Sequence, residues 1–286
     1  MMPQNSKIQS LQILRALAAT SVVYLHIGCK PWFGGFGVDI FFVLSGFVMC
    51  HITDSGESGK EFFLRRIARI VPLYWLLTLF AFLLAWVKPT LFNSTTADLG
   101  NLLRSLFFIP YEKENGSISP IIPVGWTLNY EVYFYLLITF STVVFGKKWH
   151  LLVSLAIMAL YLFSNLLIES SDVVKFMSNQ IALEFVFGIL VHFFNKKWRR
   201  KVLSLGAVVN IGIIIGCYSF MALMDVFRIE SMRALTLGLP SSIMLLSFMS
   251  LESMLSDLPT KVTMWLVEIG NASYATYLSH LYVVEG

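Results

Sequence analysis

Apolar segments long enough to cross a lipid bilayer follow one another along almost the whole chain. A membrane-spanning helix needs about 17 to 25 predominantly apolar residues. Segments of this kind lie at 11–27, 36–52, 71–88, 124–146, 150–168, 177–194, 202–224, 234–252 and 265–286. A shorter run at 99–110 fits either an interfacial helix or half a span. We therefore expect an all-α, polytopic transmembrane bundle of about nine to ten helices.

The balance of residues favours the same class of protein. Hydrophobic residues make up 57% of the chain and charged residues 13%, far below the roughly 25% charged residues of a soluble domain. The net charge of +4 comes from small clusters of Lys and Arg between apolar segments. Nucleic-acid binding would require one continuous basic face, so we expect no nucleic-acid partner and a lipid bilayer instead.

The three cysteines lie far apart and form neither a C-x-x-C pair nor a Cys/His pattern. Neither a disulfide framework nor a metal site is therefore expected. The links between the apolar segments differ in charge: GKEFFLRRIAR, GKKWH and NKKWRRK are basic, whereas IESSD is acidic. Basic links remain on the cytoplasmic side of a membrane. This rule predicts a cytoplasmic N-terminus and an external loop at 111–123.

The first apolar segment contains two polar residues, Arg15 and His26, that are expensive to place in a membrane. Their spacing corresponds to roughly 16 Å along a helix and to a difference of only about 20° in direction. Both side chains should therefore point from one side of that helix. His26 suits general-base chemistry at neutral pH. The alternatives are a polar contact between helices for His26 and a headgroup contact for Arg15.

The second apolar segment overlaps the link GGFG and contains Asp39 near its start. The glycine spacing matches neither a P-loop nor a dinucleotide fingerprint. A carboxylate at the start of a helix complements the helix dipole, and this structural interpretation of Asp39 is preferred over catalysis.

The stretch GWTLNYEVYFY places Glu131 inside an apolar segment, toward its predicted outer end. An unpaired carboxylate at that depth indicates function. If the first and fourth segments are neighbours, Glu131 could meet His26. Trp126 and Tyr130 fit either an interfacial aromatic belt or a binding role.

Arginines cluster in FFLRRIARIVPLYW, where Arg65 and Arg69 are four residues apart and Arg66 and Arg69 three. These spacings bring the arginines onto one helix face. They fit anchoring to anionic lipid, or binding of a phosphorylated ligand by guanidinium groups.

Six segments resemble, in order, the bacterial membrane acyltransferase family 3: ILRALAATSVVYLHI, GGFGVDIFFVLSGFVM, FLRRIARIVPLYW, GWTLNYEVYFY, LEFVFGILV and NASYATYLSH. This resemblance implies a bundle of about ten helices in the bacterial inner membrane. It also implies transfer of an acyl group from cytoplasmic acyl-CoA, usually acetyl-CoA, to a sugar hydroxyl at the outer face. No permanently bound cofactor is implied.

The resemblance assigns roles to individual positions. His26 corresponds to the histidine regarded as catalytic in the family, and Glu131 is expected to assist it. On the acyl-CoA side the expected residues are Arg15, Arg65, Arg66, Arg69 and Tyr74. On the acceptor side, or in support, they are Trp126, Asn129, Tyr130 and Asp39. Family members continue through another helix after the segment resembling SYATYLSH, so 1–286 is expected to be one domain that lacks its last helix.

The predicted function is thus O-acyl transfer from acyl-CoA to a carbohydrate or glycolipid, with His26 as general base or acyl carrier. A rival interpretation is a proton-coupled transporter of a glycan- or acyl-linked solute, in which Arg15, His26 and Glu131 relay protons. A structural or lipid-scrambling role is a third.

Overall fold

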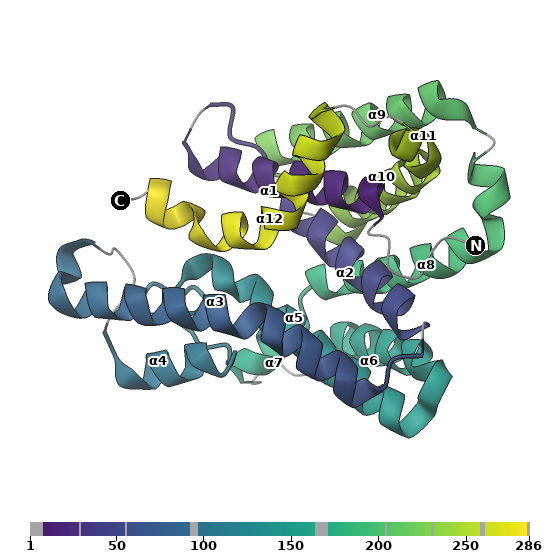
Figure 1. Ribbon diagram of the computed structural model, residues 1–286. Coiled ribbons are helices and arrows are strands. Elements are labelled where there is room, and N and C mark those ends of the chain that lie inside the picture. The colour runs from purple at the N-terminus through teal and green to yellow at the C-terminus, as the bar shows by residue number, and fades with distance from the viewer. Residues whose placement is uncertain are drawn as a thin grey trace. The chain divides into compact units, whose positions relative to one another are not determined.

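A computed structural model describes residues 8–28, 30–54, 56–91, 97–163, 171–203, 205–229, 232–257 and 261–284. Within this part of the chain the backbone forms twelve α-helices, a π-helix and a few 3-10 turns (Figure 1). The helices gather into two compact units, Met1–His51 with Leu183–Gly286, and Ile52–Ala182. The all-helical architecture predicted from the sequence is confirmed.

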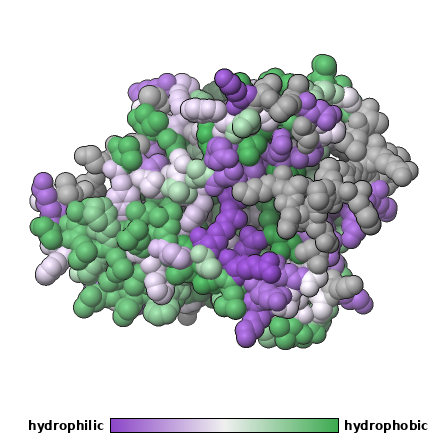
Figure 2. Space-filling view, in the orientation of Figure 1, coloured by the Kyte–Doolittle hydropathy of each residue, from purple (hydrophilic) through white to green (hydrophobic). Residues whose placement is uncertain are grey.

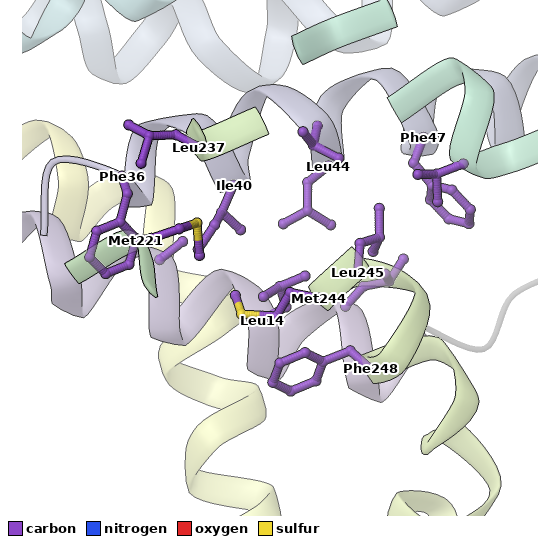
Figure 3. Packing of buried hydrophobic residues seen from close by; sticks show 14 residues of the cluster. Leu14, Phe36, Ile40, Leu44, Phe47, Met221, Leu237, Met244, Leu245 and Phe248 are labelled. Atoms are coloured by element: carbon purple, nitrogen blue, oxygen red, sulfur yellow. The ribbon is translucent and has the colours of Figure 1, made fainter. Parts of the chain in front are cut away.

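The first unit is built from helices at both ends of the chain. They are α1 (Gln9–His26), α2 (Gly37–Thr53), α8 (Ile181–Leu203), α9 (Gly206–Val226), the π-helix Ala234–Gly238, α10 (Leu239–Ser250), α11 (Glu252–Asp257) and α12 (Lys261–Val284). Its core joins side chains from α1, α2, α9 and α10, including Leu14, Ile40, Met221 and Met244 (Figure 3). The apolar faces of four helices are thus buried against one another.

Helix α1 is held at its N-terminus by α11. Ile8 at the N-cap offers no side-chain acceptor. Instead, the carboxylate of Glu252 accepts hydrogen bonds from the backbone N–H groups of Gln9 at 2.9 Å and Ser10 at 2.7 Å. A carboxylate at this position satisfies free N–H groups and complements the helix dipole. Glu252 therefore fixes the start of the helix that carries Arg15 and His26.

Glycines allow neighbouring helices of the first unit to touch backbone to backbone. A Cβ atom on Gly270 of α12 would lie 1.9 Å from the carbonyl oxygen of Gln12 on α1. Likewise, a Cβ on Gly188 of α8 would lie 2.0 Å from the carbonyl oxygen of Val43 on α2. Close approach at small residues is the usual way in which helices pack in membranes.

The second unit contains α3 (Gly59–Val87), α4 (Leu99–Leu106), α5 (Trp126–Phe145), α6 (Trp149–Phe163) and α7 (Asp172–Met177). Ser58 and Glu61 form a capping box that begins α3. The sequence analysis placed the arginines in a basic link and expected a span at 71–88. The structure has one continuous helix that includes Pro72, so the arginines and the apolar segment belong to the same helix, α3.

The chain between α4 and α5 folds around the buried side chain of Ser105. Its Oγ accepts a hydrogen bond from the backbone N–H of Ile121 at 3.0 Å and lies 3.1 Å from the hydroxyl of Tyr111. Its carbonyl oxygen accepts a hydrogen bond from the hydroxyl of Tyr74 at 3.1 Å. The loop predicted to lie outside the membrane is therefore a folded segment tied to α3 and α4.

Three of the described helices are long and apolar enough to cross a membrane: Gly59–Val87, Pro123–Phe145 and Gly206–Val226. Gly37–Thr53, Trp149–Phe163 and Ala234–Ser250 are apolar but shorter. Large hydrophobic side chains are exposed along α3, including Leu76, Leu83 and Trp86, and Figure 2 shows hydrophobic surface over α3 and α4. Apolar surface of this extent suits contact with lipid. The predicted spans at 36–52, 124–146 and 234–252 correspond to Gly37–Thr53, Pro123–Phe145 and Ala234–Ser250. The predicted span at 150–168 ends outside the described residues, and the number of nine to ten membrane helices stays a prediction.

Candidate functional site

Arg15 lies half-buried on α1 and is directed toward α12. Its Nε donates a hydrogen bond to Oγ of Ser273 at 3.1 Å. Ser273 is fully buried, so the guanidinium is anchored at its inner side. One charged side chain of the predicted site is thus held in a defined position by a neighbouring helix.

His26 lies at the other end of α1 and also faces α12. Its Nδ1 is 2.9 Å from the carbonyl oxygen of Val22. Because a carbonyl oxygen only accepts hydrogen bonds, this contact requires the proton on Nδ1 and leaves Nε2 as the basic nitrogen of the neutral ring. Nε2 of His26 has no hydrogen-bond partner among the described residues.

Both polar residues of α1 therefore contact the same helix, as their spacing predicted. Arg15 bonds Ser273, and the ring of His26 packs against His280 with ring centroids 4.7 Å apart. The two contacts run in the same order along both helices, so α1 and α12 are parallel. The contact between α1 and α12 thus has Arg15 at one end and the imidazoles of His26 and His280 at the other.

Asp39 sits fully buried in the first turn of α2. It receives two hydrogen bonds from Arg233, from Nε at 2.9 Å and from Nη2 at 2.7 Å. The carboxylate of Glu184, which is also fully buried, approaches Nε of Arg233 to 4.0 Å. The dipole interpretation of Asp39 was incomplete, because the main partner of this carboxylate is a guanidinium from a segment about two hundred residues away.

In the second unit, α5 presents the aromatic residues of the predicted acceptor side. The ring of Tyr130 stacks on Phe176 of α7, with centroids 4.2 Å apart, and its hydroxyl donates to the Phe176 carbonyl oxygen. Trp126 packs edge-on against Tyr130 at 5.9 Å. These contacts give Tyr130 a packing role, and a contact of its hydroxyl with an acceptor stays a prediction.

Asn129, on the same helix, differs from its neighbours. Its side chain is almost completely buried, and neither Oδ1 nor Nδ2 has a hydrogen-bond partner among the described residues. Buried amides are almost always satisfied, so an exception requires a reason. A ligand that offers both a donor and an acceptor would satisfy this amide.

Glu131 is half-buried one turn before Tyr135, whose hydroxyl donates to Oε2 of Glu131 at 2.5 Å. Arg66 and Arg69 of α3 both interact electrostatically with the Tyr135 hydroxyl. Glu131 therefore belongs to a group that includes two of the predicted acyl-CoA arginines. It lies in a different unit from His26, and the pairing of these two residues stays a prediction.

The other residues predicted on the acyl-CoA side lie along α3. Arg65 is exposed and forms an ion pair with Glu57 at 2.9 Å. The guanidinium of Arg66 lies over the ring of Phe62, 5.6 Å from its centroid. Tyr74 is fully buried, and its ring stacks on Phe108. Its hydroxyl donates a hydrogen bond to the carbonyl oxygen of Ser105. No group of three or more potential metal ligands is present in the described part of the chain.

Comparison with known proteins decides the family. The model of an acyltransferase domain family (Acyl_transf_3) matches residues 8–286. The chain belongs to this acyltransferase family. The resemblance inferred from the sequence motifs is thereby confirmed, and the chain is an acyltransferase with apolar helices suited to a membrane.

Curated relatives of this acyltransferase include the exopolysaccharide production protein ExoZ of Rhizobium meliloti, which is 31% identical over 88% of this chain and 77% of its own length. The peptidoglycan O-acetyltransferase OatA of Listeria monocytogenes is 29% identical over 50% of this chain and 25% of its own length. The acyltransferase MdmB of Streptomyces mycarofaciens is 30% identical over 48% of this chain and 39% of its own length. No solved structure matches the chain.

Two of the polar residues brought together in the first unit were missed or undervalued in the sequence. Arg233 directly precedes an apolar segment, and the predicted topology places the start of that segment on the same side as Asp39. Oppositely charged residues at corresponding ends of two spans were the available signal. His280 lies inside the apolar segment 265–286, and no local pattern links it to His26.

Proposed function

We propose that this acyltransferase moves an acetyl or other short acyl group from cytoplasmic acyl-CoA to a hydroxyl of a cell-surface or secreted carbohydrate. The printed names of two relatives, one for exopolysaccharide production and one for peptidoglycan O-acetylation, support a polysaccharide acceptor. Under this proposal the protein crosses the bacterial inner membrane several times, with its N-terminus in the cytoplasm.

One observation carries the proposal: His26 has its Nδ1 bonded to its own helix and its Nε2 free of partners among the described residues. That arrangement fixes the tautomer and leaves a basic nitrogen for substrate. Imidazole is the side-chain group best suited to remove and return a proton at neutral pH.

In the direct route, Nε2 of His26 removes the proton from the acceptor hydroxyl while the oxygen bonds to the carbonyl carbon of the thioester. The carbon–sulfur bond then breaks, and the departing CoA thiolate takes the proton from His26. The products are the acyl ester and CoA. In the two-step route, Nε2 first attacks the thioester carbonyl, and the carbon–sulfur bond breaks to release the CoA thiolate. The acceptor oxygen then takes the acyl group from Nε2, and the hydroxyl proton ends on the CoA thiolate.

The remaining residues are assigned to the two substrates. Arg66 and Arg69, with Arg65 beside them on α3, would bind phosphates of CoA, because guanidinium groups recognise phosphate through paired hydrogen bonds. Arg15 would lie on the donor side. Glu131, Asn129 and Trp126 would contact the acceptor, the unsatisfied amide of Asn129 being the most direct support for a polar ligand.

The test uses protein reconstituted in vesicles with labelled acetyl-CoA and a bacterial surface glycan. Wild-type protein should label the glycan and raise its intact mass by whole acetyl groups, whereas His26→Ala should not. Uptake of the glycan or its precursor without a mass change would favour the transporter interpretation. Equal labelling by wild-type protein and His26→Ala would refute the role of His26.

The arginine assignment has its own control. Arg66→Gln and Arg69→Gln should each raise KM for acetyl-CoA by about tenfold, the loss of one charge-assisted contact. With an acetyl-pantetheine donor, which lacks the nucleotide phosphates, the variants should match wild type. A defect that persists with the pantetheine donor would indicate lipid anchoring or a packing role instead.

A further inference from the structure

His280 on α12 has a basic nitrogen that the described protein leaves unused. Its side chain is buried, with only 5% of the residue exposed. Nδ1 lies 2.6 Å from the carbonyl oxygen of Tyr277, so it carries the proton, and Nε2 is the lone-pair nitrogen. Nε2 is itself buried and has no hydrogen-bond partner among the described residues.

The ring of His280 packs against that of His26. Their centroids lie 4.7 Å apart, and the ring planes are inclined by 65°. Both rings have the same internal arrangement, with Nδ1 bonded to a carbonyl of its own helix and Nε2 without a hydrogen-bond partner in the described part of the chain. Two basic nitrogens of the same kind therefore lie on adjacent faces of α1 and α12.

Among the described residues, His26 is the titratable group that interacts electrostatically with His280. On α1, Arg15 lies eleven residues before His26 and is bonded to Ser273 of α12. Two adjacent imidazoles cannot easily both be charged, so one proton bound to the pair disfavours a second.

We propose that His280 forms a proton-sharing pair with His26. The proposal rests on the proposed acyl transfer. When His26 removes the proton from the acceptor hydroxyl, that proton is shared with Nε2 of His280 until the CoA thiolate takes it. In the two-step route Nε2 of His26 carries the acyl group, and His280 then supplies the basic nitrogen that receives the proton of the hydroxyl. No oxidant or further reactant is required in either route.

Three variants separate a proton role from packing. His280→Phe keeps a ring of similar size without a nitrogen, and it should lower kcat by about tenfold to a hundredfold while KM for both substrates changes little. His280→Gln supplies an acceptor atom and should retain more activity than His280→Phe. His280→Ala should regain activity with added imidazole but not with pyrrole, which has the same ring size and no basic nitrogen. Wild-type kcat in His280→Phe, or equal rescue by pyrrole, would overturn the proposal.

A second measurement does not depend on transfer. In ¹⁵N-histidine NMR of wild-type protein, the signals of His26 and His280 should titrate as a coupled pair, and in His280→Phe the His26 signal should titrate in a single step. Coupled titration in a protein that transfers no acyl group would leave the pair standing and refute the proposed function. Independent titration in an active protein would refute the pair alone.

Discussion

Arg233 donates hydrogen bonds from Nε and Nη2 to the two carboxylate oxygens of Asp39, at 2.9 and 2.7 Å. This contact joins the π-helix region to the start of α2, and Glu184 lies beside it with its nearest oxygen 4.0 Å from Nε. Two buried carboxylates thus share one guanidinium. Removing one member of such a cluster destabilises the protein, because it leaves a buried charge without a partner.

Replacing Asp39 with Ala should destabilise the protein by about 3–5 kcal/mol, because the guanidinium of Arg233 would lose its bidentate partner. The measurement is thermal or denaturant unfolding in detergent. The double variant Asp39→Asn with Arg233→Gln removes both charges. Its stability should be closer to that of wild type than the stability of Asp39→Ala is. If the double variant were less stable than either single change, the ion pair would not be the interaction lost.

Gly270→Ala should force α12 away from α1, because the new Cβ would lie 1.9 Å from the carbonyl oxygen of Gln12. We expect a loss of about 1–3 kcal/mol in stability. We also expect a fall in acyl transfer, since the shift would disturb the pairing of His26 with His280. The matched control is Gly212→Ala on α9, where a Cβ meets nothing within 4 Å, and this variant should be neutral or slightly stabilising. Equal behaviour of the two variants would contradict the close contact.

Asn129→Leu should stabilise the protein and impair its activity. Removing a buried amide whose two polar atoms are unsatisfied recovers about 1–3 kcal/mol, while the ligand that the amide would bind loses its partner. The contrasting variant is Thr127→Val, which breaks the hydrogen bond from Oγ1 to the Val124 carbonyl at 3.1 Å and should therefore destabilise. An Asn129→Leu protein that is both destabilised and fully active would argue against a ligand contact.

Lys113, in the loop between α4 and α5, should make stability depend on pH. Burial lowers the pKa of its ammonium group from 10.5 to about 8, and Nζ has no hydrogen-bond partner among the described residues. Because the pKa is lower in the folded protein, folding is penalised in full below about pH 8, and the penalty fades as the pH rises toward 10.5. Lys113→Met should thus be more stable than wild type at pH 7, by on the order of 3 kcal/mol.

The control for Lys113 is the same comparison at high pH. Near pH 10.5 the difference between Lys113→Met and wild type should largely vanish, because the amine is then neutral in the folded protein and about half neutral in the unfolded chain. A stability difference that stays constant from pH 7 to pH 10.5 would show that packing of the methionine, rather than loss of a buried charge, is responsible.

Local periodicity predicted some of the site well. The eleven-residue separation of Arg15 and His26 placed both on one side of a helix, and both contact α12. Helical geometry alone determines that relationship, so no tertiary information was needed. The family, and with it acyl transfer, could also be inferred because its motifs are spread in order along the chain.

Contacts between distant segments could not be predicted in the same way. Asp39 meets Arg233, and His26 meets His280, across about two hundred residues or more. Hydropathy identifies spans but not which spans are neighbours. The predicted third span began at residue 71, whereas α3 begins at Gly59 and continues through Pro72, so the basic link and the span form one helix. Prolines are tolerated in membrane helices when neighbouring groups satisfy the freed carbonyl.

The most direct test of acyl transfer through His26 compares three proteins reconstituted under identical conditions: wild type, His26→Gln and Gly212→Ala. The quantity measured is the rate at which the acetyl group of labelled acetyl-CoA appears as an ester on the glycan. We predict equal rates for wild type and Gly212→Ala, and a rate at least about a hundredfold lower for His26→Gln, the range expected when a general base is removed. A folded His26→Gln protein that acetylates the glycan at the wild-type rate would contradict the central claim.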